Sequence, residues 1–232
     1  MRPAQDWLRC MRSRHNRHHV SDKYHIVTVL ADISGVDAIG LHRLAYAQDG
    51  YFTIRQARLH GFSGRLLAHH ISRGRYQRER RGLYRLRDYP GSGHEEVRAL
   101  WLAVGAERAA ISHESALELH GLSDVLPDRV HMIVDRSQRG LRPPAGVVLH
   151  TTLIPLTPAE VVIRDGIRVT APARSILDAA SAGTAPEQIE TAVRQSVDRG
   201  LVMAQDLITL AEDRGGRVAR LVRRATDRNH TG

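Results

Sequence analysis

Hydrophobic and polar residues follow a helical pattern over residues 37–48, where apolar side chains recur every three or four positions. The dipeptide Asp49-Gly50 is typical of a turn and ends this first helix. Thr53 comes next as a candidate N-cap for a short second helix over residues 54–60. The pattern therefore predicts two helices that are separated by only a few residues.

The next segments predict a third helix and a β-hairpin. Gly61-Phe62 indicates a tight turn, and the helix after it begins at its candidate N-cap Ser63 and runs to about residue 72. Gly74 stops this helix, because glycine commonly follows a helix C-terminus. Residues 76–87 alternate like a hairpin with Arg81-Gly82 at its turn. Two short helices, a glycine-containing turn and a basic hairpin make a winged helix-turn-helix.

The remainder of the chain mixes helical and strand patterns. Residues 90–93 are rich in glycine and proline, which is typical of a linker. Helices are expected near residues 96–104, 112–119 with Ser112 as cap, 172–180, 186–198 and 205–213. Strands are expected over residues 129–134 and 147–150 and in a hairpin over residues 161–170. A last helix is expected within the basic residues 214–232. The predicted fold class is α+β: a winged helix-turn-helix over residues 35–90, then a mixed α/β domain over 94–232.

Residues 1–34 differ in composition from the rest of the chain. They are rich in arginine and histidine, and we interpret them as a partly disordered basic arm or as sequence translated upstream of the true start. Met11 is a possible later start. His15, His18 and His19 could alternatively bind a metal, because short histidine-rich tracts do so, but no acidic or cysteine partner stands nearby.

Composition limits the class of protein. No run of 18 apolar residues exists, so no membrane span is expected, and the N-terminus lacks the apolar stretch of a secretion signal. A single cysteine, Cys10, excludes an intramolecular disulfide and a four-cysteine zinc site. These features together predict a cytoplasmic location.

The net charge of +9 is unevenly distributed along the chain. Residues 50–88 hold ten arginines against only Glu79 and Asp88, a net charge of +8. Genome bias toward arginine would not concentrate the excess in one short segment. Because the segment coincides with the third helix and the hairpin, the charge favours a surface that neutralises DNA phosphates.

The residues expected to contact DNA lie on these elements. Arg65 and His69, four positions apart on the third helix, share an outward face and are the candidates for base contacts. Ser63 can offer donors to a phosphate at the helix N-terminus. The other predicted DNA-binding residues are Thr53, Arg55, Arg73, Arg75, Arg78, Arg80 and Arg81. A solvated charged face, or a winged helix used for protein interaction, are the alternatives.

Four segments resemble the AbiEi-type antitoxins of toxin–antitoxin systems, and the resemblance covers about residues 36–210. They are "GYFTIRQARLHGFS" (50–63), "RRGLYRL" (80–86), "LWLAVGAERAAISHESALELHGLSD" (100–124) and "DGIRVTAPARSILDAA" (165–180). The resemblance implies an N-terminal winged helix that represses its own operon by binding inverted repeats. It also implies a C-terminal domain that counters a nucleotidyltransferase toxin, commonly without a stable complex. The arginine- and histidine-rich arm departs from the family.

The resemblance also carries a candidate site onto Arg174 and Asp178 of "PARSILD". The two residues stand four positions apart on a predicted helix and can form an ion pair. A structural clamp that holds this helix on the strand ending at Thr170 is the favoured interpretation of the pair. His113 is similarly expected to make a hydrogen bond in the first turn of its helix rather than to act in catalysis.

No enzyme motif appears in its required context. Nuclease chemistry needs clustered carboxylates with a lysine, and the only lysine, Lys23, stands apart from them. Ser115 lacks the flanking glycines of a hydrolase elbow. Glu114, Glu118 and His120 could be imagined as metal ligands, but a surface helical face explains them. The sequence therefore predicts no enzyme, no catalytic residue, no metal and no cofactor.

Three functions remain open from the sequence. The first is an autoregulatory antitoxin, with double-stranded DNA of its own promoter and a nucleotidyltransferase toxin as partners. The second is a stand-alone winged-helix transcription factor with an effector- or protein-binding C-terminal domain. The third is a protein-interaction module that does not bind DNA. None of the three involves a membrane.

Overall fold

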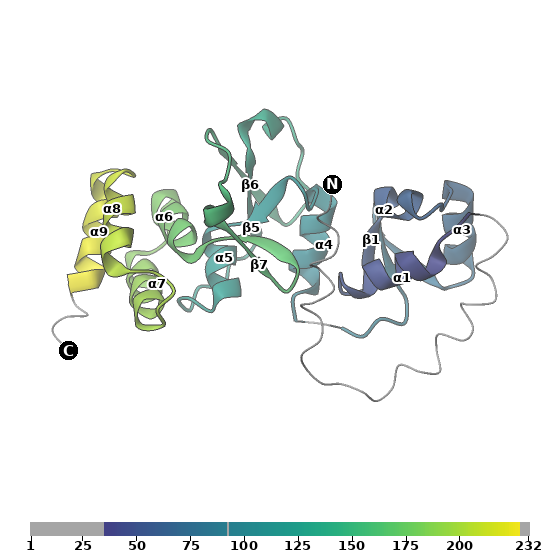
Figure 1. Cartoon of the computed structure of the whole chain (residues 1–232), viewed down its shortest axis with the longest axis horizontal. Coiled ribbons are helices and arrows are strands. Elements are labelled where there is room, and N and C mark those ends of the chain that lie inside the picture. The colour runs from purple at the N-terminus through teal and green to yellow at the C-terminus, as the bar shows by residue number, and fades with distance from the viewer. Residues whose placement is uncertain (1–34, 92, 228–232) are drawn as a thin grey trace, which may run out of the picture.

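The computed structural model describes residues 35–91 and 93–227, and the predicted arm of residues 1–34 lies outside them. The fold is α+β, as the sequence predicts, and it contains two sheets. Figure 1 shows an elongated arrangement with α1 to α3 at one end, the larger sheet in the middle and the last helices at the other end. No helix among the described residues is long and apolar enough to cross a bilayer.

The N-terminal unit packs three helices on a three-stranded antiparallel sheet of order β1-β3-β2. Its elements are α1 (Ala38–Tyr46), β1 (Tyr51–Thr53), α2 (Ile54–Leu59), α3 (Gly64–Ser72), β2 (Tyr76–Arg80) and β3 (Leu83–Leu86). Phe52, Phe62 and Tyr76 form the centre of its core, with Leu41 and Leu67 packed around these rings. Burial of this apolar surface is the main source of its stability.

Local residue choices explain where these helices begin and turn. Asp37 accepts a hydrogen bond from the backbone N–H of Gly40 at 2.7 Å and caps α1. Thr53 and Gln56 form a reciprocal capping box at the start of α2. Gly61 has a φ of 81°, and a Cβ there would collide with the carbonyl of Gly35. Glycine therefore permits the tight connection between α2 and α3.

The larger unit contains a five-stranded sheet of order β6-β5-β4-β8-β7. Its strands are β4 (Ala109–Ile111), β5 (Val130–Asp135), β6 (Val147–Thr152), β7 (Val161–Arg164) and β8 (Ile167–Thr170). The β4–β8 and β5–β6 pairs are parallel, and the β4–β5 and β7–β8 pairs are antiparallel. The central strand β4 was not predicted, because three residues are too few to show alternation.

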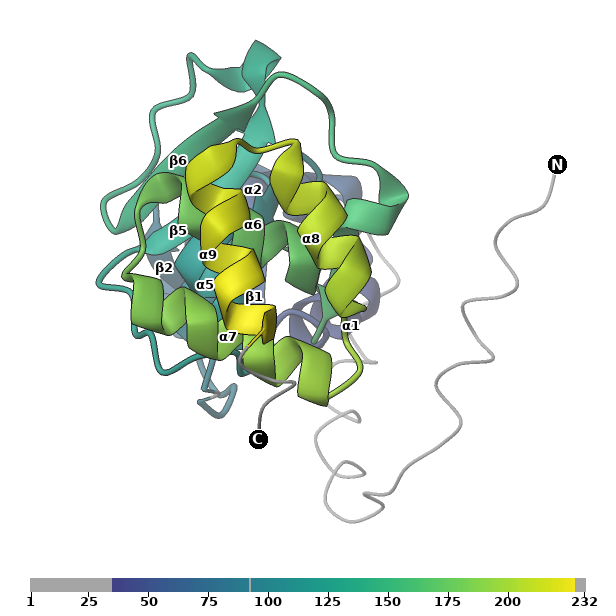
Figure 2. The ribbon, with the colours of Figure 1, turned by 90° about the vertical axis from the view of Figure 1, so that its left-hand side faces the viewer.

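Helices complete this unit on the sheet and at the far end of the molecule. They are α4 (Glu95–Val104), α5 (His113–His120), α6 (Pro172–Ala182), α7 (Pro186–Asp198), α8 (Ala204–Glu212) and α9 (Gly216–Asp227), with short 3-10 turns at Arg136–Gln138 (η4) and Pro158–Glu160 (η5). Helices α6 to α9 bury a second core of small aliphatic side chains together with Leu117 and Leu122. In the end-on view of Figure 2, α8 and α9 lie side by side in front of α6.

Helix α4 joins the two units. Tyr51 and Leu83 of the small sheet share a core cluster with Trp101 of α4 and with the large sheet. The buried Arg98 donates to the carboxylate of Asp49 and to the carbonyl of Asp165, so it links the turn between α1 and β1 to the β7–β8 turn. A buried guanidinium is stable only when its donors are satisfied in this way. The junction therefore combines apolar packing with a paired buried charge.

Candidate nucleic-acid interface

Helix α3 is anchored by its apolar face and capped at its N-terminus. Leu67 is 1% exposed and packs in the N-terminal core, while Phe62 is buried directly before the helix. The Ser63 hydroxyl accepts a hydrogen bond from the backbone N–H of Leu66 at 3.1 Å, as an N-cap does. The predicted cap of this helix is therefore present.

The opposite face of α3 is polar and open to solvent. Arg65 and His69 are both exposed and stand four positions apart, so they share one face of the helix. Arg73 is exposed at the C-cap of the same helix. Figure 1 places α3 at the far end of the N-terminal unit, away from the large sheet. No part of the larger unit therefore covers this helix among the described residues.

The β2–β3 hairpin extends this basic face. Arg78 and Arg80 are exposed on the edge strand β2, and Arg81 is exposed at the turn, where Gly82 has a φ of 80°. The register shifts between Arg78 and Arg80, which marks a β-bulge. Bulges increase the local twist of a strand and redirect its side chains, and they are common on edge strands.

Seven exposed arginines define what we call the basic surface. They are Arg65, Arg73, Arg75, Arg78, Arg80, Arg81 and Arg87. Within residues 35–91 and 93–227, none of the seven forms an ion pair with a carboxylate. Their guanidinium groups can therefore bind the phosphates of a polyanion without first breaking an ion pair within the protein.

A layer of aromatic and histidine rings supports the basic surface from inside. The ring of His70 lies 5.1 Å from that of Tyr76, and His42 Nε2 lies 3.3 Å from the Tyr76 hydroxyl. Burial lowers the pKa of both histidines below their ordinary value and, with Arg75 lowering them further, keeps the rings neutral. Burial also raises the pKa of Tyr76 to about 12. This layer adds no charge of its own to the surface.

Two predicted DNA-binding residues also have partners within the protein. The Thr53 hydroxyl caps α2 by accepting from the backbone N–H of Gln56 at 3.2 Å. Arg55 donates to Glu107 of the larger unit at 2.8 Å. The side chain of Arg55 remains 70% exposed, so contacts of Arg55 and Thr53 with DNA stay predictions.

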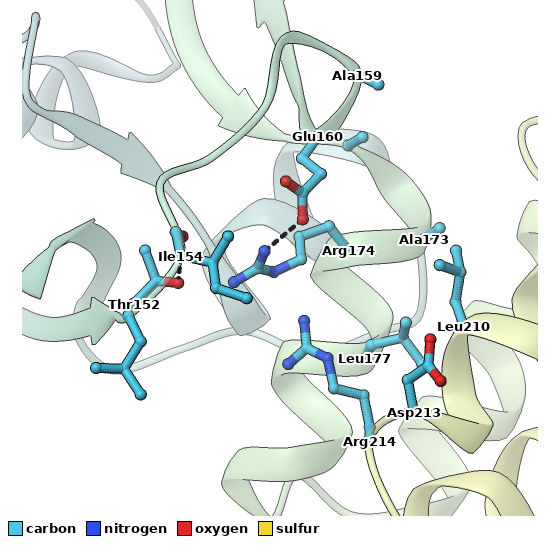
Figure 3. Close-up of a pocket in the computed structure, with 12 residues that line it drawn as sticks. Thr152, Ile154, Ala159, Glu160, Ala173, Arg174, Leu177, Leu210, Asp213 and Arg214 are labelled. Atoms are coloured by element: carbon cyan, nitrogen blue, oxygen red, sulfur yellow. Dashed lines mark hydrogen bonds and ion pairs between the residues drawn. The ribbon is translucent and has the colours of Figure 1, made fainter.

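Arg174 and Asp178 do form the expected ion pair, at 2.7 Å between Nε and Oδ2. The pair belongs to a larger network: Arg174 also contacts Glu160 at 2.5 Å, and Arg214 contacts Asp178 at 2.9 Å. Asp178 is only 4% exposed, so its charge depends on both arginines. Figure 3 shows Arg174 on α6, Glu160 in the η5 turn before β7 and Arg214 in the connection between α8 and α9. The geometry is that of a clamp between elements.

A cavity of about 630 Å³ lies beside this clamp. Thr152 and Ile154 line it from the end of β6, and Leu177 and Leu210 line it from α6 and α8 (Figure 3). Its walls are mainly apolar, with the charged ends of the clamp on one side. Such a lining suits a small ligand or an apolar side chain of a partner better than a phosphate.

His113 makes the hydrogen bond that the sequence suggests, with Ser112 Oγ 2.9 Å from its Nδ1. Ser112 consequently does not cap α5 through its side chain, contrary to the prediction. His131 and His150 lie beside His113, and this three-histidine group was missed because its members come from three separate elements. Burial, followed by the charges of His150 and His131, lowers the pKa of His113 to about 3.

The acidic and histidine residues considered as metal ligands on α5 do not converge. Glu114 accepts a hydrogen bond from Thr184 at 2.7 Å, and His120 Nε2 lies 2.8 Å from the carbonyl of Thr170. Glu114 and His120 each join α5 to a different neighbour, and His120, which is 2% exposed, does not lie on the surface face that the sequence suggests.

Fold and site together define a basic α+β protein whose arginine-bearing helix and hairpin project from a larger mixed unit. A family model described as the AbiEi antitoxin C-terminal domain matches residues 108–227, more than half of the chain. The chain therefore belongs to the AbiEi antitoxin family, as the sequence segments suggest. This family supports a role as an antitoxin in a toxin–antitoxin system.

Comparison with solved structures gives the same fold. The crystal structure of the RV2827C protein from Mycobacterium tuberculosis is similar with a TM-score of 0.52 over 81% of this chain and 75% of that chain. Sequence identity is 14%, so the similarity concerns the fold alone. A search of curated protein sequences found no match.

Proposed function

We propose that this antitoxin-family protein binds duplex DNA through α3 and the β2–β3 hairpin and represses the operon that encodes it. In this proposal residues 35–90 act as a winged helix-turn-helix, with α3 in the major groove and the hairpin on the backbone. The observation that carries the proposal is the basic surface, where seven exposed arginines lack a carboxylate partner among the described residues. Inverted repeats in the promoter would receive two copies of the chain.

The exposed residues divide into two roles. Arg65 and His69 face outward from the first two turns of α3, where a recognition helix contacts base edges, so we assign them to sequence readout. Ser63 stands at the N-terminus of α3, a position suited to a phosphate. The phosphate contacts are assigned to Arg73, Arg75, Arg78, Arg80 and Arg81.

We further propose that residues 94–232 counter a nucleotidyltransferase-type toxin and carry no catalytic residue. The family match supports the antitoxin role of this region. Arg174 and Asp178 serve it by holding α6 against Glu160 and Arg214, since their charged groups are occupied by one another. Co-purification of the chain with the toxin tests whether this action involves direct contact.

A gel-shift comparison tests the DNA-binding proposal. The full chain is mixed with DNA from upstream of its own gene and with a shuffled duplex of equal length. The double variant Arg65→Ala/His69→Ala should lose most of its preference for the upstream DNA and keep its affinity for the shuffled duplex. Equal loss on both duplexes would show that α3 does not read bases.

The control removes two arginines elsewhere. Arg217 and Arg220 are exposed on α9, at the opposite end of the molecule from α3 (Figure 1). Arg217→Ala/Arg220→Ala removes two positive charges from this distant surface and should leave the preference unchanged. A comparable loss in this control would indicate that net charge, and not the basic surface, determines binding.

The cavity beside Arg174 favours one alternative, a stand-alone transcription factor whose C-terminal domain binds a small effector. Co-expression distinguishes the two functions. An antitoxin restores growth of cells that express a nucleotidyltransferase toxin encoded beside its gene, and the variant Arg65→Ala/His69→Ala still does so. Failure of the wild-type chain to restore growth, with DNA binding intact, would support the alternative.

A further inference from the structure

Three histidines from separate elements meet in the larger unit. His131 lies on β5, His150 on the adjacent strand β6, and His113 at the first position of α5. Each offers one ring nitrogen, and these three nitrogens lie within 4.8 Å of one another. No other group of three or more such ligands occurs among the residues that the structure describes. The parallel register of β5 and β6 places His131 and His150 on neighbouring positions of the sheet.

The spacing of the nitrogens is close to that around a tetrahedral ion. His150 Nε2 lies 3.2 Å from His131 Nδ1. Two imidazole ligands about 2.0–2.1 Å from a tetrahedral Zn²⁺ place their nitrogens about 3.3 Å apart. The separation of this pair therefore needs almost no adjustment, and the third nitrogen must approach the pair by at most about 1.5 Å.

One ring must also rotate. The rings of His113 and His150 are stacked, with centroids 3.6 Å apart and planes inclined by 17°. Two stacked rings cannot both direct a nitrogen lone pair at one ion, so binding requires a rotation about χ2 of His113 or His150. Torsions of this kind have broad, shallow minima, and His150 is only half-buried, so this rotation is accessible.

The surroundings suit a neutral set of imidazole ligands. Ser112 Oγ lies 2.9 Å from His113 Nδ1, so an N–H at Nδ1 can donate to this hydroxyl and leave the lone pair of Nε2 for an ion. This is the outer-sphere contact that commonly fixes the tautomer of a ligating histidine. Burial lowers the pKa of all three rings, which keeps them unprotonated at neutral pH.

Nearby charges do not oppose a cation overall. The positive charges of Arg174 and Arg214 lower the pKa of His113, but both guanidinium groups are paired in the clamp with Asp178. The negative charge of Asp178 in turn raises the pKa of His150. At His131, the negative charge of Glu114 raises the pKa and the positive charge of Arg129 lowers it. Arg174 is also paired with Glu160, so three carboxylates stand against three arginines around the cluster.

We propose that His113, His131 and His150 form a binding site for a divalent transition-metal ion with the preferences of Zn²⁺. Three imidazoles and no carboxylate in the cluster favour Zn²⁺, Co²⁺, Ni²⁺ or Cu²⁺ over Mg²⁺ or Ca²⁺. Three protein ligands leave the fourth position of a tetrahedral ion for solvent. The ion joins β5, β6 and the start of α5 next to the Arg174–Asp178 clamp, so it stabilises the larger unit and is independent of DNA binding.

Cobalt(II) titration of the full chain tests this site, because Co²⁺ in a tetrahedral site absorbs visible light and Zn²⁺ displaces it. We expect one equivalent of Co²⁺ to produce this absorption. The arm variant, with His15, His18 and His19 replaced by asparagine, should retain it. Ser112→Ala removes only an outer-sphere contact and should reduce the affinity for the ion by about 10–100-fold. His150→Asn removes a ligand and should reduce the affinity further than that.

The folding of each variant is measured alongside its affinity for the ion. Circular dichroism and the melting temperature in chelator first establish that each variant is folded, and Zn²⁺ should raise the melting temperature of the wild type but not of His150→Asn. Loss of all binding in the arm variant would overturn the proposal, as would wild-type affinity in folded His150→Asn. If His150→Asn does not fold, Ser112→Ala decides, and an unchanged affinity in that variant overturns the site.

Discussion

Replacing Arg80 and Arg81 by alanine should reduce the salt dependence of DNA binding while leaving the stability of the protein unchanged. Both side chains are exposed at the end of the β2–β3 hairpin and form no ion pair within the described ranges. Neither contributes to the core of the N-terminal unit, which consists of apolar side chains behind the sheet. Their removal therefore acts on the bound state alone.

The magnitude follows from counterion release. The five arginines that we assign to phosphates can each neutralise one phosphate, and each contributes about 0.9 to the slope of log affinity against log salt. Five contacts give a slope of about −4.5 per bound chain, and the three that remain in the double variant give about −2.7. Between 50 and 200 mM salt the wild type should lose about 500-fold in affinity and the double variant about 40-fold.

Fluorescence anisotropy at four or five salt concentrations measures these slopes on one labelled duplex. The matched control is Arg217→Ala/Arg220→Ala, which should keep the wild-type slope because α9 lies away from the proposed interface (Figure 1). The reasoning is refuted if the two double variants have the same slope, or if the slope of Arg80→Ala/Arg81→Ala equals that of the wild type.

Three further predictions concern stability. Ser63→Ala removes the oxygen that caps α3 and should lower the free energy of unfolding by about 1 kcal/mol in urea, whereas Ser63→Asp should keep the cap and weaken DNA binding by charge repulsion. Asp178→Ala leaves Arg174 and Arg214 without their shared carboxylate and should cost about 3–5 kcal/mol; a loss below 1 kcal/mol would contradict the clamp. Burial, then Arg75, lowers the pKa of His70 in the folded state below 6.5, so the unfolded chain binds the proton first and stability falls as pH drops below 6.5. His70→Leu should remove that part of the acid sensitivity, by at most about 1.4 kcal/mol per pH unit, and identical pH profiles would disprove it.

The parts of the fold predicted from sequence are those with strong local signals. The three N-terminal helices follow from apolar spacing, and α2 and α3 begin at the predicted caps Thr53 and Ser63. The β7–β8 hairpin turns at Asp165-Gly166, where both residues have positive φ. In each case a few neighbouring residues determine the conformation, so the chain itself contains the information.

The parts that could not be predicted depend on contacts between distant segments. Arg85 alternates with Tyr84 and Leu86, a pattern that places it on the outward face with Arg87. In the structure it pairs with Glu95 at 2.5 Å and lies over the ring of Tyr51. Both faces of β3 are therefore in contact with protein, because α4 covers the face that alternation assigns to solvent.

The same limit applies to the candidate sites. The outward face of α3 follows from helical spacing, and the structure leaves Arg65 and His69 exposed as that spacing requires. Helical spacing also places Arg55 on an outward face, but there it pairs with Glu107 of the larger unit, a contact that the spacing does not indicate. The convergence of His131 and His150 likewise depends on the parallel pairing of β5 with β6, which no local pattern in the sequence indicates.

The account depends on the basic surface being the DNA-binding face, and NMR titration of the isotope-labelled full chain with a duplex from its promoter measures this directly. Amide resonances of residues 63–73 and of the hairpin over residues 76–82 should shift as DNA is added, and those of α7 to α9 should not. Shifts confined to α9, whose Arg217 and Arg220 are also exposed, would contradict the central claim, as would the absence of any shift at low salt.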